Sequence, residues 1–362
     1  MKKIRPNPFI EKSIFDFTVQ ELLDIPLDAI KHHSTEQGKE FCVELFFNYY
    51  RDKGFPYYNL SPSELEREYK KFKKYEVDRI LLNDELELQQ VMLGLNVVNS
   101  FHPQMWSVKC REKLSPMDVF SDDKLFRRAL MKRINMSDSK MANFNVRKSL
   151  KIFSGSQSVS NFRPTISKFL YERFCDETSI VLDPCMGYGG RLLGSSTSVG
   201  KYVGVDPSTE AIAGNNNLAN FIQSVEKKTA EFELINAPFE DVEFEGESFD
   251  FIFTSPPYFN VEKYSYEETQ SHMRYQKYDI WVEGFLKPFI YNSCRFLKTG
   301  RYFALNVHGK DLIKDSLRIA LECGFTLVET HQMRLSKICG RGQNKTLEKY
   351  KHEPIFIFKK SY

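Results

Sequence analysis

Two different spacings of apolar residues divide the chain near residue 150. After a helix start at Ser61–Glu64, apolar residues follow at 65, 69, 72 and 75, which predicts helical structure from Ser61 to Leu95. A second helix is predicted from Asp122 to Ile134, and its outer face is basic, with Arg127, Arg128, Lys132 and Arg133. Few alternating apolar segments occur before residue 150. We therefore expect residues 1–150 to form a mostly α-helical N-terminal region.

From residue 179 onward, short β-rich runs alternate with helical stretches. The predicted strands span residues 179–183, 202–206, 232–236, 249–254, 301–307, 326–330 and 354–358. Helical periodicity lies between several of them, most clearly at 279–297 and 310–323. Strands that alternate with helices in this way form a doubly wound, mostly parallel sheet. We expect an α/β domain over residues 151–362.

The length of 362 residues favours two compact units, and 41% apolar with 14% aromatic residues is enough for hydrophobic cores. The net charge of +3 predicts no polyanionic partner by itself. Local charge is more informative, because residues 109–148 hold eleven Lys/Arg against five Asp/Glu, and residues 331–362 hold eight against two. These segments are either a surface that faces phosphates or ordinary solvated helix faces.

Seven cysteines are scattered singly, without a CxxC pair. This spacing argues against a zinc site and a disulfide framework, and it is typical of a protein of the reducing cytoplasm. No stretch approaches the roughly 18 apolar residues of a membrane span, and the N-terminus has no apolar signal region. We expect a cytoplasmic protein with no membrane partner and no metal.

The apolar run Phe249–Phe253 ends in Thr254-Ser255-Pro256-Pro257-Tyr258. Two consecutive prolines fix φ and remove two backbone donors, so the neighbouring carbonyls can point at a ligand without internal competition. The corner therefore presents two hydrogen-bond acceptors and one aromatic ring, which is what a planar amine on a nucleobase requires.

A second motif, Ile180 to Arg191, consists of a strand, a glycine-rich turn and a helix start. Glycines there allow a ligand to approach the backbone at the carboxyl end of a strand. The spacing matches neither the dinucleotide GxGxxG nor a phosphate loop. Asp206 ends the next strand, roughly 20 residues further on, where a carboxylate can accept both hydroxyls of a ribose.

Together these motifs resemble those of class I methyltransferases. Ser-Pro-Pro-Tyr resembles the catalytic motif of amino-methyltransferases, and its serine form is most similar to that of the cytosine-N4 DNA enzymes. Asp183-Pro184-Cys185-Met186-Gly187-Tyr188-Gly189-Gly190 resembles their glycine motif. The resemblance covers roughly residues 150–362. It implies a Rossmann-like fold with an antiparallel last strand, and S-adenosyl-L-methionine as the cofactor.

The resemblance also implies roles for single residues. Asp183, Pro184 and the turn from Cys185 through Gly187 to Gly189 would line the methionine part of the cofactor. Asp206 would bind the ribose, Pro207 would touch the adenine, and Phe239 lies in the loop that contacts this ring. Arg163, in the segment before the helical run 165–174, would pair with the cofactor carboxylate, or else is a solvated arginine at a helix start. Cys185 is expected to be a small buried filler.

The implied chemistry is methyl transfer to an exocyclic amine. Ser255 Oγ and the Pro256 carbonyl would hold the amine hydrogens, Pro257 would keep the corner rigid, and Tyr258, with help from Phe259, would stack on the base. Such a pocket cannot reach an atom inside a duplex, so the base must be flipped out. The carbon-5 cytosine route needs a Pro-Cys-Gln nucleophile, which the chain lacks.

The leading hypothesis is therefore a site-specific DNA methyltransferase that modifies cytosine N4 in double-stranded DNA, as in a restriction-modification system with a cognate restriction endonuclease. DNA would be gripped by residues 1–150 and by basic loops such as Ser336–Tyr350. Three alternatives stay open: adenine-N6 DNA methylation, methylation of an RNA base amine, and a degenerate, non-catalytic DNA-binding protein.

Overall fold

The computed structural model describes residues 6–82, 86–152, 155–337 and 350–361. The predicted loop residues 338–349, and Phe153 and Ser154 before the glycine motif, lie outside this part of the chain. The chain forms two compact units, one from residues 1–59 and 103–159, the other from residues 60–102 and 160–362. This grouping differs from a single boundary at residue 150, because residues 60–102 pack into the core of the second unit.

The first unit is helical. Its helices are α1 (Val19–Asp24), α2 (Leu27–His33), α3 (Glu36–Lys53), α6 (Pro116–Ser121), α7 (Asp123–Met136) and α8 (Asn143–Ile152). Phe46 and Phe47 of α3 are buried, as are Phe126 and Leu130 of α7, and the rings of Phe47 and Phe126 lie 5.7 Å apart. The predicted helix 122–134 corresponds to α7, capped by Asp122.

One of the four basic residues predicted for the outer face of α7 is not on the surface. Arg133 is buried, and its Nε donates to Ser149 Oγ at 2.9 Å. Arg127 is ion-paired with Glu44 at 2.6 Å. Arg128 is exposed. The basic face of α7 is therefore narrower than the sequence indicates.

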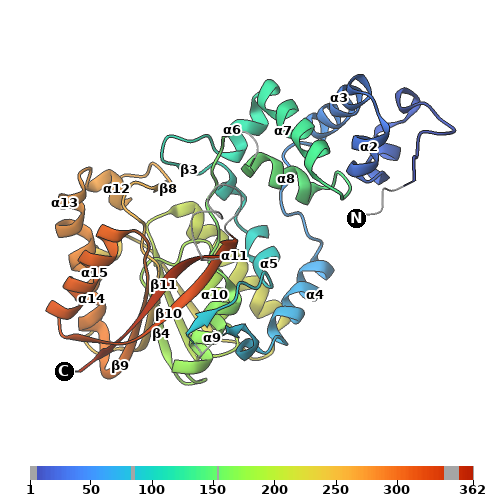
Figure 1. Cartoon of the computed structure of the whole chain (residues 1–362). Helices are drawn as coiled ribbons and strands as arrows, with labels where there is room; N and C mark the ends of the chain where they lie inside the picture. The colour runs from blue at the N-terminus through green and yellow to red at the C-terminus, as the bar shows by residue number, and fades with distance from the viewer. Residues whose placement is uncertain (1–5, 83–85, 153–154, 338–349, 362) are drawn as a thin grey trace. The chain divides into compact units, whose positions relative to one another are not determined.

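The second unit is built on a nine-stranded sheet with the order β1-β2-β10-β11-β9-β7-β4-β5-β6 (Figure 1). Its strands are β1 (Leu81–Leu82), β2 (Glu87–Leu88), β4 (Ile180–Asp183), β5 (Lys201–Asp206), β6 (Glu231–Asn236), β7 (Phe249–Thr254), β9 (Leu297–Asn306), β10 (Phe325–Lys337) and β11 (Tyr350–Lys360). Each of the seven predicted strands is present. The strands β6, β5, β4, β7 and β9 pair in parallel, whereas β11 lies antiparallel between β9 and β10. The predicted doubly wound, mostly parallel α/β sheet is confirmed, and its last strand is antiparallel as expected.

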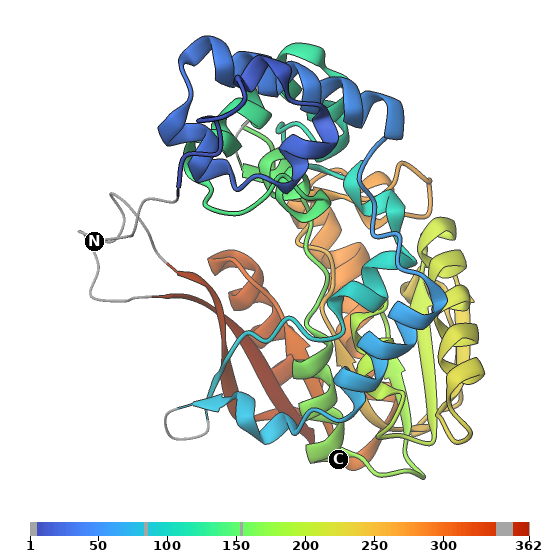
Figure 2. The same ribbon diagram turned by 90° about the vertical axis from the view of Figure 1, so that its right-hand side faces the viewer.

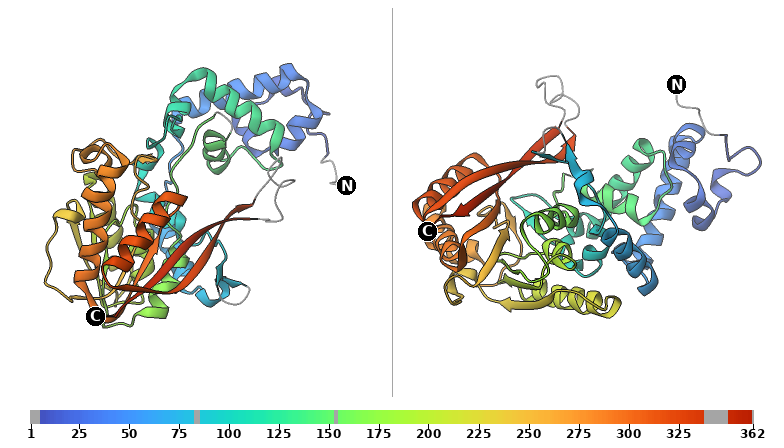
Figure 3. Two further views of the ribbon diagram at one scale, coloured as in Figure 1. Left: turned by 60° about the vertical axis from the view of Figure 1, so that its left-hand side comes forward. Right: turned by 90° about the horizontal axis from the view of Figure 1, so that it is seen from below.

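Helices cover both faces of this sheet, because successive buried residues of a strand point to opposite sides. Val181 and Phe251 belong to the core under α9 (Pro164–Phe174), α10 (Gly190–Ser195) and α11 (Thr209–Val225). Leu182 and Ile252 belong to the core under α14 (Lys287–Phe296) and α15 (Lys310–Glu322). The two layers lie on either side of the sheet in Figure 1, and the long β10–β11 pair is visible in both views of Figure 3.

The helix predicted from Ser61 to Leu95 is wrong beyond its first third. α4 (Pro62–Lys73) begins at the Ser61–Glu64 capping box as expected, but the chain then turns through a 3-10 segment (Val77–Ile80) before α5 (Leu95–Ser100). Val77 and Ile80 are buried in the same core as Phe72 of α4 and Phe169 of α9, so tertiary packing overrides the local periodicity. Figure 2 shows α4 (light blue) and α9 (green) on this side of the sheet.

None of the helices in the described ranges is long and apolar enough to cross a membrane.

Candidate active site

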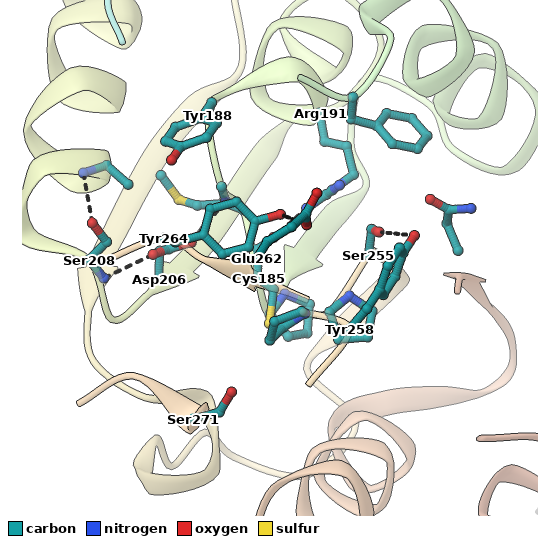
Figure 4. A pocket seen from close by; sticks show the side chains of 18 of the residues that line it. Cys185, Tyr188, Arg191, Asp206, Ser208, Ser255, Tyr258, Glu262, Tyr264 and Ser271 are labelled. Atoms are coloured by element: carbon teal, nitrogen blue, oxygen red, sulfur yellow. Dashed lines mark hydrogen bonds between the residues drawn. The ribbon is translucent and has the colours of Figure 1, made fainter. Parts of the chain in front are cut away.

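A pocket with a cavity volume of about 220 Å³ lies at the carboxyl ends of β4, β5 and β7 (Figure 4). The chain runs from β4 outward through β5 and β6, then returns to β7 on the other side of β4. Ligands of open α/β sheets bind at such a switch point, where the strand order reverses. The pocket therefore occupies the position that the topology favours for a nucleotide-type ligand.

Most of the residues predicted for the site line this one cavity. They come from five segments that are far apart in the sequence: Arg163, Pro184, Cys185, Gly187, Asp206, Pro207, Phe239, Ser255, Pro256, Pro257 and Tyr258. Two predicted residues, Asp183 and Gly189, do not line it. The fold thus brings the glycine turn, the strand-end aspartate and the Ser-Pro-Pro-Tyr corner together around a shared space.

The two glycines of the turn have different tasks. Both have positive φ, +56° at Gly187 and +77° at Gly189, which glycine adopts at little cost. A Cβ at Gly187 would meet nothing within 4 Å, whereas a Cβ at Gly189 would lie 2.5 Å from Asn215 Oδ1. The space beside Gly187 is therefore open on the side of the cavity, and Gly189 is required for packing against α11.

Three side chains fix the backbone of this turn. Asp206 Oδ2 accepts from Gly187 N at 2.9 Å, and Asn215 Nδ2 donates to Gly187 O at 2.8 Å. Asn161 Nδ2 donates to Tyr188 O at 2.6 Å. Because both polar groups of Gly187 are held, the turn is formed before any ligand arrives. Asn215 gives no signal in the sequence, since it lies mid-helix among other polar residues.

Asp206 ends β5 and is nearly enclosed, with 9% of its surface exposed. Its Oδ1 accepts from Ser208 N at 2.9 Å, so each carboxylate oxygen holds one backbone N–H. Burial raises the pKa of Asp206 to about 6, although the two N–H contacts oppose this shift. Each oxygen keeps a further lone pair with which a ligand hydroxyl could bond.

Asp183 is placed differently from its predicted role. The residue is fully buried behind the pocket, where its Oδ2 accepts from Arg191 Nε and from Tyr202 OH, both at 2.7 Å. Arg191 itself lines the pocket and also donates to the Cys185 carbonyl. Burial disfavours the charged guanidinium, but the Asp183 carboxylate outweighs burial and raises the pKa of Arg191. Asp183 thus anchors a buried arginine next to the glycine turn.

An apolar wall completes this half of the pocket. Pro207 and Phe239 contribute to it, together with Pro238, Ala211 and Phe285. Phe239 is only 1% exposed and packs against Phe289, so only a small part of it reaches the cavity. Phe285 comes from a π-helical turn, Val282–Leu286. Such turns are frequent at functional sites.

The Ser-Pro-Pro-Tyr corner forms the other half of the pocket. Ser255 Oγ and Tyr258 OH lie 3.5 Å apart, and Tyr258 OH donates to Glu353 Oε1 at 2.8 Å. Burial, followed by the Glu353 carboxylate, raises the pKa of Tyr258 well above its usual value, so its hydroxyl stays protonated. Figure 4 shows the Ser255 and Tyr258 side chains side by side at the cavity.

Phe259, expected to help Tyr258 stack on a base, does not line the cavity. Its φ is +57°, an uncommon backbone conformation for a residue with a side chain. The ring lies 5.6 Å from that of Tyr278 and 5.7 Å from that of Trp281, within the apolar core. The ring that the corner offers to a ligand is therefore that of Tyr258.

Arg163 lines the pocket, and the negative charge that interacts with it is that of Glu353, a residue of the protein itself. Its Nη1 donates to Asn161 O at 2.7 Å. Burial lowers the pKa of Arg163, and the Glu353 carboxylate opposes that shift. Arg163 is thus associated with the half of the pocket that holds Tyr258, in addition to any contact that it makes with a cofactor.

Several lining residues were missed in the sequence: Glu262, Tyr264, Asn306, Met333, Leu335 and Glu353. Glu262 and Tyr264 are hydrogen-bonded to each other in the segment after the motif, and burial raises the pKa of Glu262. Glu353 and Asn306 come from adjacent strands, β11 and β9. No local motif marks Glu353 and Asn306, since only the sheet pairing brings them to the corner. Among the described residues, no group of three or more His, Cys, Asp or Glu could hold a metal ion.

No protein-family model matches the chain, and no curated protein matches its sequence. Solved structures are similar to it in part. The YcgJ protein from Bacillus subtilis matches at a TM-score of 0.37 and 15% identity, over 54% of this chain and 99% of that one. A SAM-dependent O-methyltransferase from Thermotoga maritima matches at 0.37 and 14%, over 56% and 68%. The tRNA (m1A58) methyltransferase TrmI from Aquifex aeolicus matches at 0.35 and 13%, over 55% and 69%. TM-scores of this size carry no conclusion about activity, and the fold is established by the strand order itself.

Proposed function

We propose that the protein is an S-adenosylmethionine-dependent methyltransferase that modifies the exocyclic N4 amine of a flipped cytosine in double-stranded DNA. The observation that carries this proposal is the shared cavity. The Ser-Pro-Pro-Tyr corner, the open space beside Gly187 and the Asp206 carboxylate all line it. An acceptor corner for an amine thus faces a site with the features of a nucleoside pocket.

The residues of the first half of the pocket fit the cofactor. Gly187 leaves room where a side chain would intrude, Asp206 offers acceptors for ribose hydroxyls, and Pro207, Pro238 and Phe285 supply an apolar wall for a purine ring. The cofactor supplies a methyl group on a sulfonium, which is already electrophilic. The protein's task is therefore binding and alignment.

The residues of the second half fit an amine. The nitrogen of cytosine N4 is a weak nucleophile because its lone pair is delocalised into the ring. Ser255 Oγ and the Pro256 carbonyl accept hydrogen bonds from the two N–H groups of this amine and draw the nitrogen toward tetrahedral geometry, while Tyr258 stacks on the base. S-adenosylmethionine would supply the methyl group: as the nitrogen–carbon bond formed, the sulfur–carbon bond would break with its electron pair remaining on sulfur, and the nitrogen would release one proton to solvent water.

The distribution of charge favours nucleic acid as the partner of the helical unit. Residues 1–59 and 103–159 contain 20 Lys/Arg and 14 Asp/Glu, a net charge of +6, whereas residues 60–102 and 160–362 contain 31 and 34, a net charge of −3. Neutralising phosphates requires clustered basic residues. The helical unit is the better candidate for a phosphate contact.

The test is expression in a host that lacks DNA methylation, followed by modification-sensitive sequencing and mass spectrometry of the nucleosides. We expect N4-methylcytosine at a defined sequence, and none from the Tyr258→Ala variant. N6-methyladenine would retain the enzyme but change the base. A methylated base amine in RNA alone would change the substrate. A purified protein with no measurable affinity for S-adenosylmethionine would refute every enzymatic form of the proposal.

A further inference from the structure

A short series of side chains connects the Ser-Pro-Pro-Tyr corner to strand β11. Ser255 and Tyr258 follow β7, whereas Glu353 lies on β11, almost 100 positions later in the chain. Tyr258 OH donates to Glu353 Oε1 at 2.8 Å, and Ser255 Oγ lies 3.5 Å from Tyr258 OH. The second distance is long for a hydrogen bond, but contacts of this kind tighten when a substrate closes the site.

The chemistry of these groups determines the direction of each hydrogen bond. Tyr258 OH donates its hydrogen to Glu353 Oε1, and the carboxylate oxygen accepts it. The Tyr258 oxygen is then left as an acceptor, and the Ser255 hydroxyl, 3.5 Å away, can donate to it. A serine hydroxyl that gives its hydrogen to Tyr258 presents only lone pairs to the rest of the pocket.

We propose that Glu353 is a positioning residue that fixes Ser255 as a hydrogen-bond acceptor, so that the corner selects an amino group over a carbonyl. This inference rests on the proposed function. A free serine hydroxyl can turn either way and would accept from an amine or donate to a carbonyl. When Ser255 donates its hydrogen to Tyr258, its oxygen can only accept. The O4 oxygen of uracil or thymine is also an acceptor, so neither oxygen would gain a hydrogen bond from the other.

The charged and titratable groups that face Glu353 are consistent with this task. Arg163, before α9, is a cation whose charge interacts with that of Glu353. Glu262, from the segment after the motif, is the other carboxyl group close to both Glu353 and Tyr258. Tyr264 donates to Glu262, which leaves Tyr258 as the donor that the structure assigns to Glu353.

A double-mutant cycle in the full-length protein tests the proposal. Glu353→Gln puts an amide in place of the carboxylate. Since an amide can both donate and accept, the direction of the hydrogen bonds from Ser255 through Tyr258 is no longer fixed. Tyr258→Phe keeps the ring and removes the hydroxyl. We expect each variant to lower kcat on duplex DNA about 10- to 100-fold, with the dissociation constant for S-adenosylmethionine within about twofold of wild type. The double variant should be no worse than the poorer single variant.

Glu231→Gln is the matched control, because it makes the same chemical change at an exposed position of β6. A second readout is the binding of duplexes in which uracil replaces the target cytosine. Wild type should discriminate against uracil, and Glu353→Gln should lose most of that discrimination.

Two results would overturn the inference alone: full activity of Glu353→Gln, or losses in the two single variants that multiply in the double variant. Multiplying losses would mean that Glu353 acts through Arg163 or the fold and not through Tyr258. A wild-type protein that methylates no base amine would instead overturn the proposed function, and this inference with it.

Discussion

The Asp206 carboxylate should make cofactor binding depend on pH in a range where most carboxylates are already ionised. The group sits at the end of β5 with each oxygen on one backbone N–H, and burial raises its pKa to about 6. Ribose hydroxyls that donate to Asp206 stabilise the ionised form, so binding must compete with protonation. The perturbation is a fall in pH from 7 to 5, compared between wild type and Asp206→Asn.

The pKa of Asp206 determines how much weaker cofactor binding should be at the lower pH. One pH unit below this pKa, roughly ten of eleven free molecules carry a protonated Asp206, so a ligand that requires the carboxylate binds about tenfold more weakly at pH 5 than at pH 7. Replacing Asp206 by a neutral residue should reduce the affinity for the cofactor by more than this fall in pH does. Hydrogen bonds to a charged group contribute about 1.5–3 kcal/mol each, so Asp206→Asn should weaken binding at pH 7 by at least about tenfold.

The same shift has the opposite consequence for the stability of the ligand-free protein. A pKa above the unfolded value means that the folded state favours protonated Asp206. This contribution to the free energy of unfolding is complete below pH 4 and is lost as the pH rises through about 6, by about 3 kcal/mol from this group alone. In the Asp206→Asn variant, the free energy of unfolding should not show this decrease as the pH rises.

Isothermal titration calorimetry of S-adenosylmethionine at half-unit steps from pH 5 to 7 measures the effect, below the range where an α-amino group titrates. Wild type should show the slope, and Asp206→Asn should show a flat profile. A flat wild-type profile would refute an ionised Asp206 as ligand acceptor. A slope that persists in Asp206→Asn would assign the titration to another group, with Glu240 the first candidate because burial also raises its pKa.

Three further outcomes are expected. Arg191→Ala leaves the Asp183 carboxylate buried without its ion pair, and should lower the free energy of unfolding by about 3–5 kcal/mol in urea titrations, whereas Lys228→Ala, at an exposed pair, should change it by less than about 1 kcal/mol. Tyr258→Ala should lower methyl transfer by at least about 100-fold in single-turnover assays with the cofactor still bound, and full activity would exclude the stacking role. Gly187→Ala places a methyl group in the open space at φ +56°, so the cofactor dissociation constant should rise about tenfold or more in calorimetry, while an unchanged value would place the ligand elsewhere.

Local patterns were sufficient wherever chemistry and periodicity coincide. The apolar runs that became β4, β5 and β7 each end at residues that line the pocket, and this is why the chain alone was enough to predict that the glycine turn, Asp206 and Ser255 lie at one site. The pattern misled where packing outweighed it. The helix from Ser61 stops at Lys73, because Val77 and Ile80 gain more from the core than from continuing the helix.

Asp183 shows why a motif does not reveal the task of each of its residues. The residue stands in the expected place at the end of β4, yet its carboxylate is taken by Arg191, eight positions later, and by Tyr202 on the next strand. Spacing along the chain gives the position of a side chain. Its partner depends on which neighbouring element supplies a donor.

The sequence by itself determined the parallel sheet, the cavity at its carboxyl edge and the two motifs that line it, because strands, glycine turns and proline corners are set by interactions between near neighbours. Only the tertiary structure decided what surrounds them. The reversed strand β11 brings Glu353 to Tyr258, α11 brings Asn215 to Gly187, and residues 60–102 join the second unit. These contacts depend on strand pairing and core packing between distant segments, which no local pattern encodes.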